Sequence, residues 1–157
     1  MSRAFVKEAE APEPHCPERL GCGGAGIPVG PVTLAAQLPA ERAATLMHDA
    51  FWCPNPQCDV AYFDASGGVV YAAEARHRGW PKDPAAAVCA CFGIDEARIM
   101  AWARAPGAPD KAAMRALLAR IAGPDARCAT CSPDGRSCET AVRRVFLRGL
   151  ETRSDTA

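Results

Sequence analysis

The sequence predicts an α+β fold in which a small β-rich part is followed by a helical part. Short apolar segments separated by Gly and Pro turns fill the first half of the chain, and amphipathic helical repeats fill the second. Nine cysteines are spread over the 157 residues, and aromatic residues make up only 6% of them. A chain with so modest an apolar core gains from metal sites that hold its loops together.

The composition excludes several classes of protein. Basic and acidic residues number 18 each, whereas a nucleic-acid-binding domain would normally carry a basic face. The polar N-terminus has no basic segment followed by an apolar run, and no window is long enough to cross a membrane. We therefore expect a cytoplasmic protein without nucleic-acid or membrane partners. In that reducing compartment an odd number of cysteines suits metal ligands better than disulfides.

The β-rich part is expected at residues 15–84, after a disordered stretch at residues 1–14. Its elements are short and separated by turn-forming residues. In order, they are a cysteine knuckle at 15–24, a strand that starts at Ile27 in the segment 27–38, a helix at 40–47, strands at 51–53 and 60–63, and a turn at 66–68 into a strand at 69–71. Residues 76–84 are predicted to be a linker.

The helical part is expected at residues 85–152 and contains three predicted helices. Asp95 caps the first, which carries Ile99 and Trp102 on one face and runs to about Ala105. Asp110 caps the second, whose apolar residues follow the helical repeat at Met114, Leu117, Leu118 and Ile121. Ser137 caps the third, at about 139–150, with an apolar stripe of Val142, Val145 and Phe146.

The first candidate metal site consists of the four cysteines of the β-rich part: Cys16, Cys22, Cys53 and Cys58. Four thiolates on two short loops can surround a tetrahedral ion, and closed four-cysteine sites are typical of structural zinc. Small residues beside the ligands, at Gly21, Gly23 and Gly24, let the backbone fold around the metal.

Other interpretations of this first site remain open. The cysteines could be buried free thiols, because cysteine is often a core residue. His15 adjoins Cys16 and could replace a ligand, whereas His48 and His77 suit solvated loop positions.

The second candidate site begins with Cys89-x-Cys91 and takes its other ligands from Cys128, Cys131 and Cys138. Two thiolates in an extended segment can serve one iron of a [2Fe–2S] cluster while a second pair serves the other iron. The helix–turn–helix between Cys91 and Cys128 would bring both ends together. Cys138 lies at a predicted helix start, where the helix dipole favours a thiolate, so it is a better candidate than Cys131. A second zinc site is the alternative.

With these residues in place, the chain resembles the N-terminal domain of CopZ-type copper chaperones over roughly residues 15–150. The resemblance depends on the order of its segments rather than on any one of them. They are Cys16-Pro17 to Cys22-Gly23, Val29 to Leu34, Phe51-Trp52-Cys53, Cys58 to Phe63, Val88 to Phe92, and Cys128 followed by Pro133, Gly135 and Cys138.

The resemblance implies one zinc ion, bound by the first set of cysteines, and one [2Fe–2S] cluster, bound by the second. The second half is similar to bacterioferritin-associated ferredoxin (BFD), a helix–turn–helix that holds such a cluster. The chain departs from the family in its Cys16-x5-Cys22 spacing and in Ser137-Cys138, which stands where the family often has two adjacent cysteines. Because Cys131 forms a C-x-x-C with Cys128, as in the ferredoxin relatives, the fourth cluster ligand stays open.

These expectations define a leading function and two alternatives. The leading function is a metallochaperone-like protein that transfers one electron through its cluster in copper or other thiophilic-metal handling. No Met-x-Cys-x-x-Cys loop is present, so we expect a separate metal-transfer protein as partner. The first alternative is a zinc-only structural adaptor that binds a protein partner. The second alternative is a thiol–disulfide oxidoreductase that uses Cys128 and Cys131. The sequence favours it less, because the C-x-x-C motif lacks a βαβ context. Nothing indicates hydrolytic or group-transfer catalysis.

Overall fold

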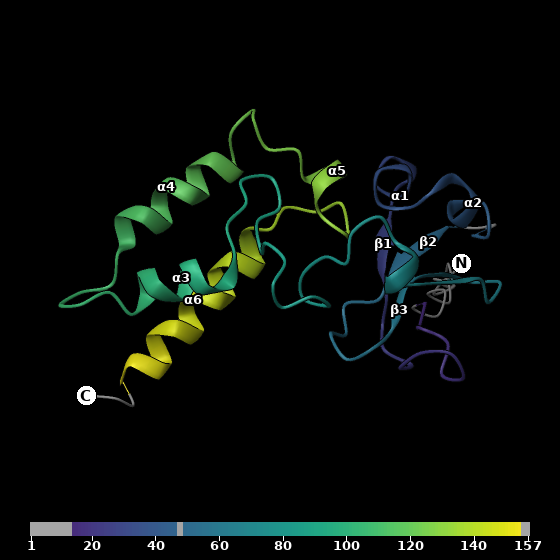
Figure 1. Ribbon diagram of the computed structural model, residues 1–157, viewed down its shortest axis with the longest axis horizontal. Helices are drawn as coiled ribbons and strands as arrows, with labels where there is room; N and C mark the ends of the chain where they lie inside the picture. The colour runs from purple at the N-terminus through teal and green to yellow at the C-terminus, as the bar shows by residue number, and fades with distance from the viewer. Residues whose placement is uncertain (1–13, 47–48, 155–157) are drawn as a thin grey trace, which may run out of the picture.

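The computed structural model describes residues 14–46 and 49–154, and these residues form three hydrophobic clusters. A four-stranded sheet with two short helices forms one part, and helices α3, α4 and α6 form the other, with α5 and long loops between them (Figure 1). The α+β prediction is confirmed at this level. The disorder expected at 1–14 falls almost entirely outside the described residues, as does position 47 of the predicted helix 40–47.

The sheet is an antiparallel meander in the order β1-β2-β3-β4. Its strands are β1 (Ile27–Val29), β2 (Ala50–Trp52), β3 (Val60–Asp64) and β4 (Val69–Tyr71). The turn at 66–68 closes the β3–β4 hairpin as predicted, with the Gly67 backbone in the left-handed region and the Asp64 carboxylate accepting from the Ser66 and Gly68 amides.

The strand expected in the segment 27–38 is short, because a helix begins at Pro31. Helix α1 (Pro31–Gln37) has proline at its first position, where the missing N–H costs no hydrogen bond. Helix α2 (Ala40–Ala43) follows Pro39 and is shorter than predicted, and a 3₁₀ turn, η1 (Ala72–Glu74), follows β4. Apolar residues of α1 and α2 contact one face of the sheet.

Strand β3 is buried along its whole length because both faces of the sheet are covered. A register irregularity between Val60 and Tyr62 alters the normal alternation of side chains. As a result, Val60 and Phe63 pack with three of the N-terminal cysteines, whereas Ala61 and Tyr62 join the core under α1. The sheet thus lies between a cysteine cluster and the α1 core.

The helical part follows the predicted capping pattern. Asp95 Oδ1 accepts from the Arg98 amide at the start of α3 (Glu96–Ala103), and Asp110 Oδ1 accepts from the Ala113 amide at the start of α4 (Lys111–Ile121). Ser137 Oγ accepts from the Glu139 amide at the start of α6 (Glu139–Ser154). The predicted apolar stripes meet in one core, which also contains Cys89 and Cys138. None of the described helices is both long and apolar enough to span a membrane.

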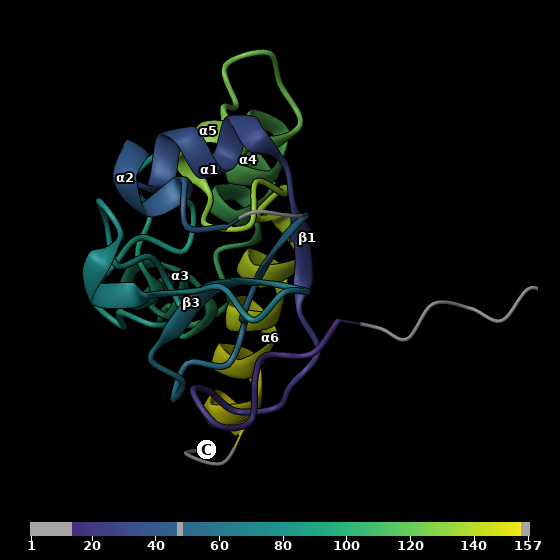
Figure 2. The same ribbon diagram turned by 90° about the vertical axis from the view of Figure 1, so that its right-hand side faces the viewer.

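Helix α5 (Cys128–Cys131), which the sequence did not predict, lies beside α1 of the β-rich part (Figure 2). Thr33 Oγ1 donates to the Ala129 carbonyl at 2.7 Å, and Gln37 Nε2 donates to the Thr130 carbonyl at 2.9 Å. Both side chains are only 4% exposed. The boundary expected between residues 84 and 85 therefore stays a prediction, and these buried hydrogen bonds cross it.

We predict that Gln37→Leu destabilises the protein by about 1–3 kcal/mol, because the buried Gln37 side chain no longer donates to carbonyls of the α5 segment. Urea unfolding followed by circular dichroism measures the effect. Gln57→Leu is the matched control, because the Gln57 side chain is exposed and its loss should cost less than about 0.5 kcal/mol. Equal stabilities of the two variants would show that the contact between α1 and α5 contributes nothing.

Candidate metal centres

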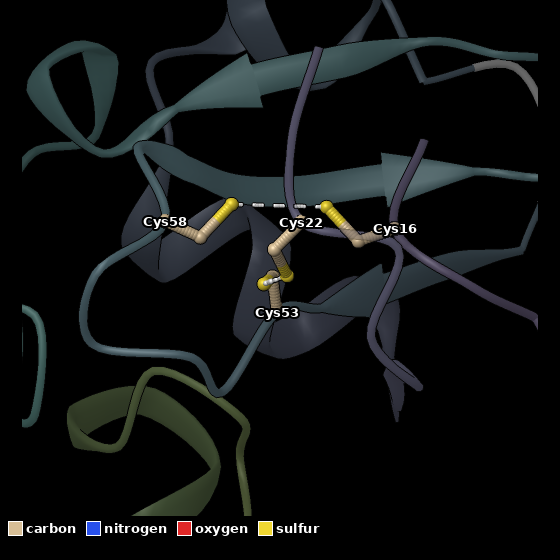
Figure 3. A group of neighbouring side chains, drawn as sticks. All are labelled: Cys16, Cys22, Cys53 and Cys58. Carbon is tan, nitrogen blue, oxygen red and sulfur yellow. Dashed lines mark hydrogen bonds between the residues drawn. The ribbon is translucent and has the colours of Figure 1, made fainter. Parts of the chain in front are cut away.

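Four cysteines of the β-rich part converge on one point. The Sγ atoms of Cys16, Cys22, Cys53 and Cys58 all lie within 4.8 Å of one another. Figure 3 shows the four side chains pointing toward a common centre from separate segments of the chain. The sulfur of Cys16 lies 3.9 Å from that of Cys58, and the sulfur of Cys22 lies 3.6 Å from that of Cys53. Three of the cysteines are buried, and Cys22 is exposed.

Cys16 and Cys22 are held by a small hairpin-like knuckle. His15 pairs with Ala25 in an isolated β-bridge, and the Cys16 amide donates to the Gly24 carbonyl at 2.8 Å. The five residues between the cysteines thus form the turn of this knuckle. A side chain at Gly21 would collide with Cys16 Sγ, so this position of the knuckle requires glycine.

Cys53 and Cys58 come from the connection between β2 and β3. The Cys53 amide donates to the Ala61 carbonyl at 2.9 Å, so the first cysteine is fixed by strand pairing. Within the loop, the Cys58 amide donates to the Asn55 carbonyl at 3.2 Å, and the Asn55 side chain accepts from the Gln57 amide. These bonds turn the chain so that both sulfurs face the knuckle.

The thiols of this group differ in acidity. Burial raises the pKa of Cys16 and that of Cys53. Burial also opposes ionisation of Cys22, but hydrogen bonds from the Gly24 backbone, the Asn55 side chain and neighbouring thiols outweigh it and lower its pKa to about 7. A metal cation would compensate the charge of the buried thiolates, which are otherwise costly.

The donor set fits zinc. In a tetrahedral zinc site with Zn–S distances near 2.3 Å, two ligand sulfurs are separated by about 3.8 Å. The two contacts across this group, at 3.9 and 3.6 Å, match that spacing. His15 is exposed and does not belong to the group of converging ligand atoms. His77 is exposed as expected, and His48 lies outside the described residues.

Lys82 lies beside this cysteine group, although the sequence analysis placed it in a linker. Its side chain is only 4% exposed. The ammonium donates to the Asn55 and Cys58 carbonyls, both at 2.7 Å, and lies 5.2 Å from the centre of the Trp52 ring. Burial lowers the Lys82 pKa, and the charges of the four cysteines act in the opposite direction.

The cysteines of the helical part form a second group. The sulfurs of Cys91 and Cys128 are 3.8 Å apart, and the Cys138 thiol is hydrogen-bonded to Cys89. Each member of the Cys89-x-Cys91 segment thus interacts with a distant cysteine, and Cys91 interacts with Cys131 as well as with Cys128. Hydrogen bonds between the backbones of Cys89 and Ile94, at 3.1 and 3.2 Å, close the turn that presents this segment.

The charge of Arg120 and the backbone amide of Arg127 both act on the second group. The hydrogen bond from Cys138 is the main reason that the pKa of Cys89 is lowered to about 7, and the charge of Arg120 assists. The same bond, together with burial, raises the pKa of Cys138. The expectation that the helix start would favour a thiolate at Cys138 stays a prediction. The Arg127 amide donates to Cys91 Sγ at 3.3 Å, although burial raises the Cys91 pKa.

Cys131 has a different environment from Cys138. It is half-buried, its sulfur lies 4.0 Å from Thr130 Oγ1, and its side chain is hydrogen-bonded to Cys91. It also lines an open cleft of about 380 Å³ between the two parts of the protein, together with Gln37 and His77. Cys138, in contrast, is buried in the helical core.

The two cysteine groups are connected by a short series of contacts. Lys82 lies over the ring of Trp52, whose centroid is 5.2 Å from that of Tyr62. The Tyr62 hydroxyl donates to the Pro133 carbonyl at 2.6 Å, just beyond Cys131. The roles of Lys82, Thr33 and Gln37 could not be predicted from the sequence, because a polar residue in a loop or on a short helix does not indicate which backbone carbonyl it will contact. The one available sign, for Lys82, was that lysine is scarce, with only three in the chain.

Comparisons with known proteins agree with this geometry. Residues 13–76 match the family model zf_CopZ, a zinc binding domain, and this range contains the first cysteine group. No curated protein matches the chain. The X-ray structure of the Archaeoglobus fulgidus CopZ N-terminal domain is similar, with a TM-score of 0.65 and 24% identity over 84% of this chain and 97% of that one. That likeness supports a shared fold only. Residues 13–76 of this chain are therefore similar to the zinc binding domain that this family model describes.

Proposed function

We propose that this chain is a zinc and iron–sulfur protein that handles copper or another thiophilic metal, in the manner of a metallochaperone. Zinc is bound by Cys16, Cys22, Cys53 and Cys58 and stabilises the fold. A [2Fe–2S] cluster is bound by Cys89, Cys91, Cys128 and Cys138, on a BFD-like helical part. When bound, such a cluster supplies a one-electron redox centre.

The observation that carries the proposal is the second group of cysteines. It lies apart from the zinc-type group, and Cys89 interacts with Cys138 while Cys91 interacts with both Cys128 and Cys131. Two irons require four of these sulfurs. The Arg127 amide and the charge of Arg120 suit an anionic centre, because they stabilise negative charge on sulfur.

Different exposure of the two groups supports different roles. Cys16, Cys53 and Cys58 are buried in a small core with Val60 and Phe63, as suits a structural ion. Cys91, Cys128 and Cys131 are only half-buried, which leaves the second site within reach of a metal ion or a protein partner.

Two observations point to copper as the metal that the protein handles: the chemistry of thiolates and the similarity to a CopZ domain. Thiolates favour Cu(I), and one electron converts Cu(II) to Cu(I). The similar solved structure is a CopZ domain, which points to copper as the first candidate. Delivery would use a separate metal-transfer protein in the cytoplasm. A zinc-only adaptor remains the competing function and differs from the proposal in metal content.

We predict one zinc, two irons and two acid-labile sulfides per chain after anaerobic preparation. The reason is that one group of cysteines has the spacing of a tetrahedral ion and the other supplies the four sulfurs that two irons require. Metal and sulfide analysis, together with the visible spectrum, measures this. A colourless protein with two zincs and no sulfide would favour the adaptor.

We predict that Cys138→Ser strongly weakens or alters the visible spectrum, because it removes the partner of Cys89. Cys131→Ser is the matched control and should leave the spectrum nearly unchanged, since Cys131 lines the cleft instead. The opposite result would mean that the cluster uses Cys128 and Cys131 as its second pair.

We predict that the dithionite-reduced protein reduces Cu(II) to Cu(I), with one electron lost from the protein for each copper reduced. Desalted protein is mixed with Cu(II) anaerobically, and the visible bands and the capture of Cu(I) by a chelator are followed together. A protein that stays reduced while copper stays divalent contradicts the copper assignment. The cluster would then have a structural role.

A further inference from the structure

We propose that Lys82 is a positioning residue that raises zinc affinity by placing one buried positive charge beside the four-cysteine site. This inference rests on the zinc assignment of the proposed function. Lys82 is unusual because lysine is almost never fully buried unless it is paired. With 4% exposure, it is the only buried lysine or arginine among the described residues.

The position of the ammonium is fixed by the ligand loop itself. Lys82 Nζ donates to the Asn55 and Cys58 carbonyls, each at 2.7 Å. Asn55 lies between the two cysteines of this loop, and Cys58 is one of them. The same lysine lies over Trp52, the residue just before Cys53, at 5.2 Å from the ring centre. Lys82 therefore contacts both ends of the segment that supplies half of the ligands.

The charge of the site explains why a cation belongs there. Zinc bound by four thiolates carries a net double negative charge, which is costly in a buried environment. Lys82 interacts electrostatically with all four cysteines of the group. No salt bridge to Lys82 is present in the described part of the chain, and none of its hydrogen-bond acceptors is a carboxylate. The thiolates are therefore its available counter-charge.

A purely structural role would have a different consequence. If Lys82 only held the two loop carbonyls, its loss would lower the zinc affinity through weaker folding, whatever the charge of the replacement. If its charge compensates the thiolates, a replacement that keeps the positive charge keeps more of the zinc affinity. The comparison of Lys82→Arg with Lys82→Met therefore separates the two roles.

The test compares Lys82→Met with the wild type by zinc competition against a chromophoric chelator. Methionine retains most of the apolar stem but removes the charge and the donors. We expect the zinc affinity to fall by about 10–100-fold, the range typical for partners outside the ligand shell. Lys111→Met is the matched control, because Lys111 is exposed at the start of α4 and should leave the affinity unchanged.

Lys82→Arg keeps the positive charge and should bind zinc more tightly than Lys82→Met. Cobalt(II) replaces zinc as a spectroscopic probe, and the thiolate-to-cobalt band should shift in Lys82→Met and not in Lys111→Met. This band reports on folded, metal-loaded molecules even if part of the variant fails to fold.

Wild-type affinity and an unshifted cobalt band in Lys82→Met would overturn the inference. Equal losses of affinity in the Met and Arg variants would also overturn it, because packing rather than charge would then be the cause. A wild-type protein without zinc would instead overturn the zinc assignment itself, so the two failures can be told apart.

Discussion

The rest of the structure depends on the convergence of four sulfur atoms from two loops of a very small domain. Thiolates held within 4.8 Å of one another repel, and burial makes each of them harder to ionise. A bound cation would reverse this balance, because its positive charge stabilises thiolates that otherwise repel one another. The short strands β1 to β4 contain only three to five residues each and could not hold these loops by pairing alone. Metal binding and folding are thus coupled in the β-rich part.

The β-rich part also positions the segment that carries Cys128 and Cys131 of the second cysteine group. Helix α1 packs on the sheet through its apolar face and extends Thr33 and Gln37 to carbonyls of α5, the segment that carries Cys128 and Cys131. From the other direction, Tyr62 fixes the Pro133 carbonyl, so the chain is held on both sides of Cys131. Loss of zinc would loosen β3 and α1 and would release these donors. The arrangement makes the geometry of the second cysteine group dependent on the integrity of the first.

Features set by local chemistry could be predicted from the sequence, and those set by long-range contacts could not. Asp95 and Asp110 cap helices because a carboxylate satisfies backbone amides three residues away, and the stripe with Leu117 and Ile121 reports a helical face directly. The cysteine spacing likewise predicted which residues of the N-terminal group would meet. Helix α5 could not be predicted, because its four residues are stabilised by α1, almost a hundred positions earlier in the chain. The burial of Lys82 could not be predicted for the same reason, since its hydrogen-bond partners belong to another loop.

The contrast between the two cysteine groups argues for a division of labour within one chain. In the first group, Cys16, Cys53 and Cys58 are buried in one core with Val60 and Phe63, and only Cys22 is exposed. The second group instead has Cys89 and Cys138 anchored in the helical core, while Cys91 and Cys128 reach toward solvent. A centre anchored on one side and accessible on the other can meet a partner without losing its place in the fold. The half-buried Cys131 lies at the cleft between the two parts and is hydrogen-bonded to Cys91, so a fifth sulfur adjoins the accessible side of this group.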